Sequence, residues 1–166
     1  MTARTRPRGV GPRVLRLLDA QYRVYDRMRH RDAFAVARRP GTAPSFEHMR
    51  GARQALVVTF KRDGEPVPTP VNFGLDEAGH LFFRTEARTP KVARIVNDPH
   101  VRVGPCNLRG RPTGPVAEGR AQILPPGDHG RAHAAIARNW STAMKPYEKV
   151  ANRVPVELAY VEVTPA

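Results

Sequence analysis

Residues 67–99, VPTPVNFGLDEAGHLFFRTEARTPKVARIVNDP, decide how the rest of this chain folds. They predict a strand over residues 67–75, a turn at residues 76–79, and a second strand that begins with the apolar run 81–83. Proline cannot donate to a β-ladder, so Pro68 and Pro70 place the first strand at a sheet edge or at a bulge. The stretch therefore predicts a hairpin with one exposed edge.

A short helix is expected directly after this hairpin. Thr89 stands at the N-cap position, Pro90 opens the first turn, and the run Asn97-Asp98-Pro99 ends the helix. The apolar residues of this helix are expected on its buried side: Val92, Ile95 and Val96.

The strand end and the helix N-terminus should lie close together, and basic and hydroxyl side chains gather at this point. They are Arg84, Thr85, Arg88, Thr89, Lys91 and Arg94. A helix N-terminus exposes unpaired N–H groups and the positive end of the helix dipole, so a phosphate would be stabilised there. An ordinary solvated basic face beside a capped helix explains the same residues and stays open as an interpretation.

The order of these elements resembles the pyridoxamine 5'-phosphate oxidase-like split-barrel flavoproteins. The run FFRTEARTPKVARIVNDPHVRV, followed by VGPCNLRGRPTG, is similar to the branch of coenzyme F420-dependent oxidoreductases within that family. In the family, an aromatic-x-Thr strand end and a basic residue opening the next helix hold the cofactor phosphate. The resemblance implies that Arg84, Thr85 and Lys91 do so here, with Arg88, Thr89 and Arg94 as weaker candidates.

The resemblance also implies a position for the cofactor ring, along residues 69–74, where Thr69, Val71 and Asn72 would lie against it. It covers residues 54–165 and is most specific over residues 85–99. Pro90 stands where the oxidases proper have an arginine before the lysine, and their C-terminal substrate-binding segment is not evident. These departures favour the deazaflavin branch over true oxidase activity.

What the resemblance implies can be stated as a set of expectations. The fold is a split antiparallel β-barrel with some helix, and the protein is a homodimer. Its reaction is hydride transfer between reduced coenzyme F420 and a small organic acceptor. FMN is the alternative cofactor on the same fold, and no catalytic residue or metal site is nominated.

Length and composition bound the class of protein. The chain has 166 residues and one cysteine, which favours one domain without an internal disulfide. No apolar run approaches the roughly 20 residues of a membrane span, and the first residues lack the apolar core of a signal peptide. The expected location is the cytoplasm.

The net charge of +13 is concentrated at the N-terminus, since residues 1–39 contribute +8 of it. We expect a disordered basic tail over residues 1–11 and a helical extension over residues 12–50, followed by the barrel over residues 51–166. An amphipathic helix from Pro12 to Ala37 packs on protein in the favoured interpretation. Binding of nucleic acid or an acidic partner through this Arg-rich helix is the non-enzymatic alternative.

Four further strands are expected from apolar runs and alternation, at residues 55–60, 100–108, 116–124 and 156–163. Gly119 suggests a bulge or a close backbone approach. Short helices are expected at residues 46–50 after Ser45, at residues 128–138 capped by Asp128, and at residues 146–152. Hairpin-linked strands of this kind favour a small antiparallel barrel.

Other reactive residue types favour structural roles. His129 and His133 have the spacing of metal ligands on a helix, but the sequence offers no third ligand nearby. Cys106 has no neighbouring base that would lower its pKa, so a small, half-buried strand residue is the simplest interpretation. In the simplest interpretation, Trp140, Lys145 and Tyr147 pack in the core or in an interface. In the alternative interpretation they form a wall of the substrate pocket.

Overall fold

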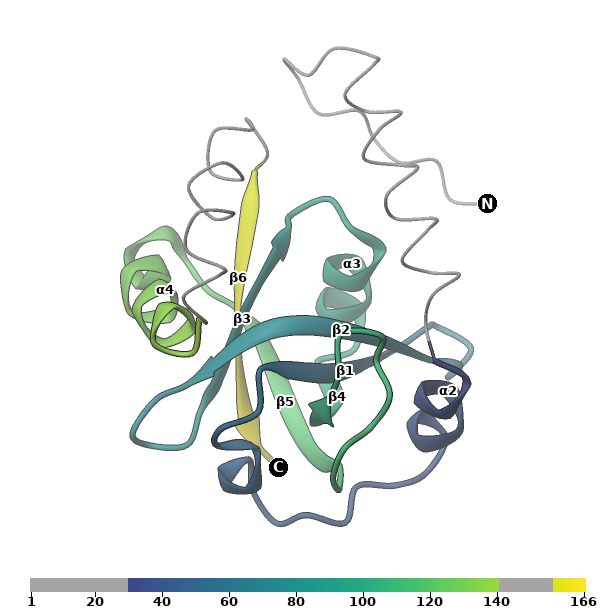
Figure 1. The fold of residues 1–166 in the computed structure, drawn as a ribbon. Helices are drawn as coiled ribbons and strands as arrows, with labels where there is room; N and C mark the ends of the chain where they lie inside the picture. The colour runs from purple at the N-terminus through teal and green to yellow at the C-terminus, as the bar shows by residue number, and fades with distance from the viewer. Residues whose placement is uncertain (1–29, 141–156) are drawn as a thin grey trace, which may run out of the picture.

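The computed structural model describes residues 30–140 and 157–166. Within them, six strands form one closed antiparallel barrel in the order β1-β2-β3-β6-β5-β4 (Figure 1). The strands are β1 (Gln54–Phe60), β2 (Pro66–Leu75), β3 (Leu81–Glu86), β4 (His100–Cys106), β5 (Ala117–Ile123) and β6 (Leu158–Pro165). The helices are α2 (Arg31–Ala37), α3 (Pro90–Asn97) and α4 (His129–Arg138), with single 3-10 turns at η1 (Glu47–Met49) and η2 (Pro126–Asp128). The antiparallel barrel predicted from the sequence is confirmed.

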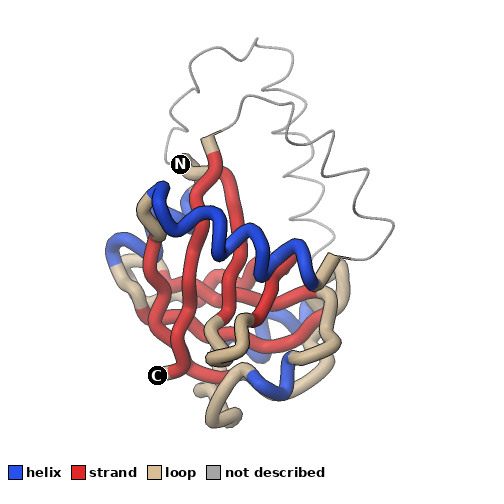
Figure 2. Tube along the Cα trace, turned by 90° about the vertical axis from the view of Figure 1, so that its left-hand side faces the viewer, coloured by secondary structure: helices blue, strands red, loops and turns tan. Residues whose placement is uncertain are grey.

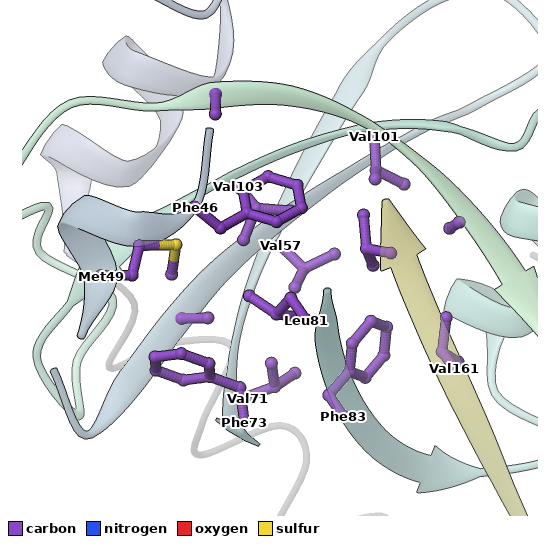
Figure 3. Packing of buried hydrophobic residues seen from close by; sticks show 14 of the residues in the cluster. Phe46, Met49, Val57, Val71, Phe73, Leu81, Phe83, Val101, Val103 and Val161 are labelled. Atoms are coloured by element: carbon purple, nitrogen blue, oxygen red, sulfur yellow. The ribbon is translucent and has the colours of Figure 1, made fainter. Parts of the chain in front are cut away.

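The barrel interior is filled by the inward-facing residues of all six strands (Figure 3). Leu81, Phe83 and Val161 lie at its centre with no measurable exposure. Phe46 and Met49, from the segment before β1, belong to the same cluster. The segment that the sequence assigns to the N-terminal extension therefore supplies part of the barrel core.

The seam between β2 and β3 is short and divides the barrel. Only three residue pairs join the two strands, from Phe73 opposite Phe83 to Leu75 opposite Leu81. Residues 66–72 of β2 pair with β1 alone among the described strands. The prolines of β2 lie in this part, where a missing N–H removes no ladder bond toward β3, so the predicted edge is confirmed.

Helix α3 lies beside the open part of this seam and packs Ile95 into the barrel core. Its predicted start and end are confirmed, with Thr89 at the N-cap. The Thr89 hydroxyl does not cap a helix amide and instead donates to the Glu86 carbonyl at 3.0 Å. The expected burial of Val96 is wrong: this residue is 72% exposed, because Lys91 and Ile95 define the buried face.

Helices α2 and α4 cover parts of the outer surface, and Figure 2 shows α4 running across the strands. Helix α4 packs Ala132, Ala135 and Ile136 against Phe82 and Tyr160. It approaches β2 so closely that a Cβ at Gly74 would overlap the Ala135 backbone. This close approach fixes the end of α4 against the β2–β3 seam.

Several boundaries differ from the sequence-based expectations. The predicted helix from Pro12 to Ala37 is not continuous, because His30 has extended backbone and caps a new helix through its side chain. β4 ends at Cys106 rather than at residue 108, since residues 107–110 turn with Gly110 at a φ of 76°. Asp128 stands at the N-cap of α4 but makes no capping hydrogen bond.

Gly119 makes a close approach and no bulge, because β4 and β5 stay in register across it while a Cβ would meet Phe46 and Val163. The predictions for the tail 1–11, for residues 12–29 and for the helix 146–152 lie outside the described residues. In the part of the chain that is described, no helix has both the length and the apolar character to cross a membrane.

Candidate functional site

Polar side chains gather just beyond the last β2–β3 residue pair, Phe73 and Phe83, where α3 meets the barrel. We call Thr59, Thr85, Lys91 and Arg94 the mouth cluster. Thr85 continues the inward face of β3 from Phe83, because alternate residues of a strand face the same side. Thr59 is fully buried and accepts a hydrogen bond of 2.7 Å from Nε of Arg94. The cluster thus joins β1, β3 and α3.

Lys91 is the unusual member, since only 8% of it is exposed. Its Nζ lies 3.5 Å from Oγ1 of Thr85 and 5.4 Å from the centre of the Phe83 ring. Lysine is rarely this buried. An ammonium group held at a helix N-terminus between a hydroxyl and an aromatic face is suited to bind an anion.

The flanking candidates Arg88 and Thr89 also contact protein groups. Arg88 is exposed, and its Nε lies 3.8 Å from the Glu157 carboxylate. Thr89 is buried and donates to the Glu86 carbonyl. Both stand at the rim of the mouth cluster, in the turn between β3 and α3.

Arg84 lies on the opposite face of β3 from Thr85. It pairs in register with Tyr160, which packs in the outer cluster beneath α4, and its guanidinium carbon is 5.7 Å from the centre of the Trp140 ring. The structure therefore brings Thr85, Lys91 and Arg94 together and directs Arg84 to the outside of the barrel.

The three ring-contact candidates on β2 also divide between the two faces. Thr69 and Val71 pair with Val57 and Ala55, which are core residues, and Val71 itself belongs to the core cluster. Asn72 faces outward and accepts a hydrogen bond from the side-chain amide of Gln54. Only Asn72 of the three reaches the outer surface.

A pocket of about 610 Å³ opens on this outer surface. It is formed by Arg53 and Gln54 at the start of β1, Asn72 and Phe73 of β2, residues 106–109 at the end of β4, and Asn139 and Trp140 after α4. We call it the outer pocket. Because Arg84 stacks on Trp140 and Asn72 lines the wall, two of the sequence-predicted residues contact or border this pocket.

The other reactive residue types have structural roles. His129 and His133 contact the Leu124 carbonyl and the Tyr160 hydroxyl, and no cluster of metal-ligand residues occurs among the described residues. Cys106 is 5% exposed, and burial raises the pKa of its thiol to about 12. A thiol that stays protonated at neutral pH is a poor nucleophile, so the predicted packing role of Cys106 is supported.

Comparison with known proteins bears on the fold. No family model matches this sequence, and no curated protein matches it. A protein of unknown function from Agrobacterium tumefaciens is 22% identical with a TM-score of 0.55, covering 77% of this chain and 58% of its own. The heme storage protein HutZ from Vibrio cholerae is 10% identical with a TM-score of 0.52, covering 74% of this chain and 91% of its own.

A FAD-binding protein from Mesorhizobium loti is 18% identical over 68% of this chain and 78% of its own, with a TM-score of 0.48 that is too low to carry weight. Identities of this size show the fold alone. The chain shares the split-barrel fold of these proteins. Because that fold also serves heme storage, it does not choose the ligand, and the site must be argued from its own residues.

Sequence reasoning missed most of the outer pocket. Gln54, Asn107 and Asn139 come from three distant parts of the chain and meet only when β1, β2 and β4 are paired. The sequence Asn-Leu-Arg-Gly at residues 107–110 signals a turn, but nothing in it marks the wall of a pocket.

Proposed function

We propose that this protein binds coenzyme F420 and uses it to reduce a small organic acceptor. The observation that carries the proposal is the buried Lys91 beside Thr85 at the start of α3. The Lys91 ammonium group and the Thr85 hydroxyl lie together at the helix N-terminus. A cofactor phosphate beside them would accept charge-assisted hydrogen bonds from both.

The residues fit such a group in charge and in hydrogen-bonding type. Lys91 and Arg94 supply positive charge, Thr85 supplies a hydroxyl, and the N-terminal amides of α3 face the same end of the barrel. Arg88 and Thr89 would assist from the rim, and Arg84 would contribute less because it stacks on Trp140. The ring would lie along β2, next to the backbone of Thr69 and Val71 and beside the Asn72 amide.

When bound, reduced coenzyme F420 would supply a hydride, and the acceptor would take it up with one proton from water. The protein contributes orientation and charge complementarity. We nominate no general acid. The homodimer that the resemblance implies belongs to the same proposal and is testable by light scattering of the purified chain.

The test is a fluorescence titration of the full-length protein with oxidised coenzyme F420. Lys91→Ala should weaken binding by about 1.5 to 3 kcal/mol, the usual scale for a hydrogen bond to a charged group. Lys61→Ala is the matched control, because Lys61 is exposed and pairs with Glu65 in the β1–β2 hairpin. The control should bind the coenzyme as the unmodified protein does.

FMN is the second candidate, because a phosphate cradle does not report which ring is attached. Titration with FMN under the same conditions decides between the two. Tighter binding of FMN that depends on Lys91 would replace the deazaflavin with a flavin and keep the site. Equal loss of binding in the two lysine variants would remove the cofactor proposal altogether.

A further inference from the structure

We propose that the outer pocket binds a planar aromatic ligand that carries a carboxylate. That this ligand is the hydride acceptor rests on the proposed function above, whereas the binding site itself does not. The inference depends on the size of the pocket, the chemistry of its walls, and its charge.

The size and the walls suit a flat apolar body. Ligand pockets span roughly 300 to 1,000 Å³, and the outer pocket measures about 610 Å³. Leu108 and Trp140 supply apolar surface, and the protonated thiol of Cys106 adds to it. Leu108 is 77% exposed, so covering it with a ligand would remove apolar surface from water.

Two side-chain amides of the pocket, those of Asn72 and Asn107, present hydrogen-bond donors, whereas Asn139 donates to the Ala52 and Phe73 carbonyls and leaves its oxygen as an acceptor. Asn107 uses its carbonyl oxygen to accept from the backbone N–H groups of Arg109 and Arg111, at 2.9 and 3.0 Å. Asn72 uses its carbonyl oxygen to accept from Gln54. Each is therefore left with its NH₂ group for a ligand, and an NH₂ group donates.

The charge of the pocket is positive. Arg53 and Arg109 line it, and its lining contains no aspartate or glutamate among the described residues. Arg53 is held in place by a 2.8 Å hydrogen bond from its Nη1 to the Asn139 carbonyl. The planar fork of an arginine matches a carboxylate in geometry, and a carboxylate only accepts hydrogen bonds. Donor amides and arginines together therefore select an anionic acceptor group.

The experiment uses three probes of one shape and different charge: biphenyl-4-carboxylate, biphenyl-4-carboxamide and 4-(aminomethyl)biphenyl. Trp140 is the single tryptophan of the chain, so its fluorescence reports on the pocket directly. Calorimetry on the full-length protein gives the affinities. We expect the carboxylate to bind at least tenfold tighter than the amide and the amine to bind more weakly than both.

Matched variants test the role of the arginines. Arg53→Gln should weaken carboxylate binding about five- to tenfold and leave amide binding unchanged, and Arg109→Gln should act in the same direction. Arg120→Gln is the control, because Arg120 is exposed on β5 and does not line the pocket. Equal affinities for the three probes would overturn the inference. So would a carboxylate affinity that neither Arg53→Gln nor Arg109→Gln changes.

A competition experiment separates this inference from the proposed function. FMN or coenzyme F420 and the biphenyl carboxylate should bind at the same time, because Lys91 and Thr85 hold the phosphate on the inner side and the ring would reach the pocket only at Asn72, at its edge. Mutually exclusive binding would assign the pocket to the cofactor ring and overturn the acceptor site. Carboxylate binding without any cofactor binding would refute the proposed function and leave the anionic aromatic site in place.

Discussion

The mouth cluster and the outer pocket flank the same short seam between β2 and β3, yet they consist of different types of residue. The mouth cluster buries a lysine among hydroxyl groups and an aromatic ring. The outer pocket has apolar walls, side-chain amides and arginines at its edge. A small group with concentrated charge is held by fixed opposite charge, whereas a flat apolar body is held by contact area.

Strand alternation separates the two regions. Two adjacent residues of β3 contribute to the two regions: Thr85 faces the mouth cluster on the inside, and Arg84 faces the outer pocket. Phe83 pairs with Phe73 at the point where β2 and β3 separate. A substitution on one face should therefore change one region and spare the other. Each prediction below tests this independence.

The largest effect is expected at Gly74, where α4 presses on β2. A Cβ at this position would overlap the Ala135 carbonyl, so Gly74→Ala should lower the free energy of unfolding by about 3 kcal/mol, at the upper end for overpacking. The displaced helix end carries Asn139 and Trp140, so the emission of Trp140 should shift. Urea unfolding and fluorescence measure both effects.

Gly130→Ala is the matched control in the same helix, because a Cβ there meets nothing within 4 Å. Alanine is a better helix former than glycine, so this variant should keep or raise the stability. If Gly74→Ala were as stable as the control, the close packing of α4 on β2 would be refuted.

The next effect concerns the mouth cluster, with a large change in binding and a small one in stability. Lys91→Met keeps an apolar chain next to Phe83 and removes the buried charge. Because the contact with the Thr85 hydroxyl is lost while the apolar packing is kept, the free energy of unfolding should fall by no more than about 1 kcal/mol. Anion binding should fall at the same time. A clear loss of stability in thermal unfolding would instead make Lys91 a structural residue.

The sequence predicted one of these two regions far better than the other. Thr85 and Lys91 lie six residues apart in a strand–turn–helix segment, so local patterns placed them together before any strand pairing was known. Thr59 of β1, which accepts from Arg94, was not among the predicted residues. Arg84 was grouped with them because sequence proximity does not tell which face of a strand points inward. Alternation did contain that information, once Phe83 and Leu81 were recognised as core residues.

The outer pocket required long-range information. Gln54 lies opposite both Asn72 and Cys106, and no local pattern sets that register. The exposure of Val96 has a similar origin, since the helix period allowed it to be buried and the packing of Lys91 turned it outward. Tertiary contacts decided both outcomes.

A smaller effect is expected at the other end of α4, away from the pocket. Glu162 of β6 accepts two hydrogen bonds from Arg131 of α4, at 3.0 and 2.9 Å, and contacts His80. The bonds from Arg131 lower the pKa of Glu162, while burial acts in the opposite direction. Glu162→Gln should cost about 1 kcal/mol at pH 7, because Arg131 is partly exposed and screened.

The pH dependence follows from the direction of that shift. A carboxylate whose pKa is lowered in the folded state stabilises the protein at pH values above its ordinary pKa of 4.5. This contribution is lost as the pH falls through the folded-state pKa. The stability difference between the unmodified protein and the Glu162→Gln variant should therefore be full at pH 7 and shrink below 4.5. A difference that did not change with pH would show that packing, rather than charge, joins α4 to β6. Trp140 emission should change little.

The smallest effect tests the separation of the two faces most directly. Arg84→Gln removes the stack on Trp140, so it should cost about 0.5 to 1 kcal/mol in stability and alter the tryptophan emission. Because Arg84 faces outward, its removal should weaken coenzyme F420 or FMN binding far less than Lys91→Ala does. The two titrations, made side by side, give the comparison.

If Arg84→Gln weakened cofactor binding as much as Lys91→Ala, the phosphate would have to contact both faces of β3. The mouth cluster and the outer pocket would then form one continuous site across the end of the strand. A small loss in Arg84→Gln, together with a large loss in Lys91→Ala, would keep them as two sites, because adjacent residues of a strand present their side chains to opposite sides.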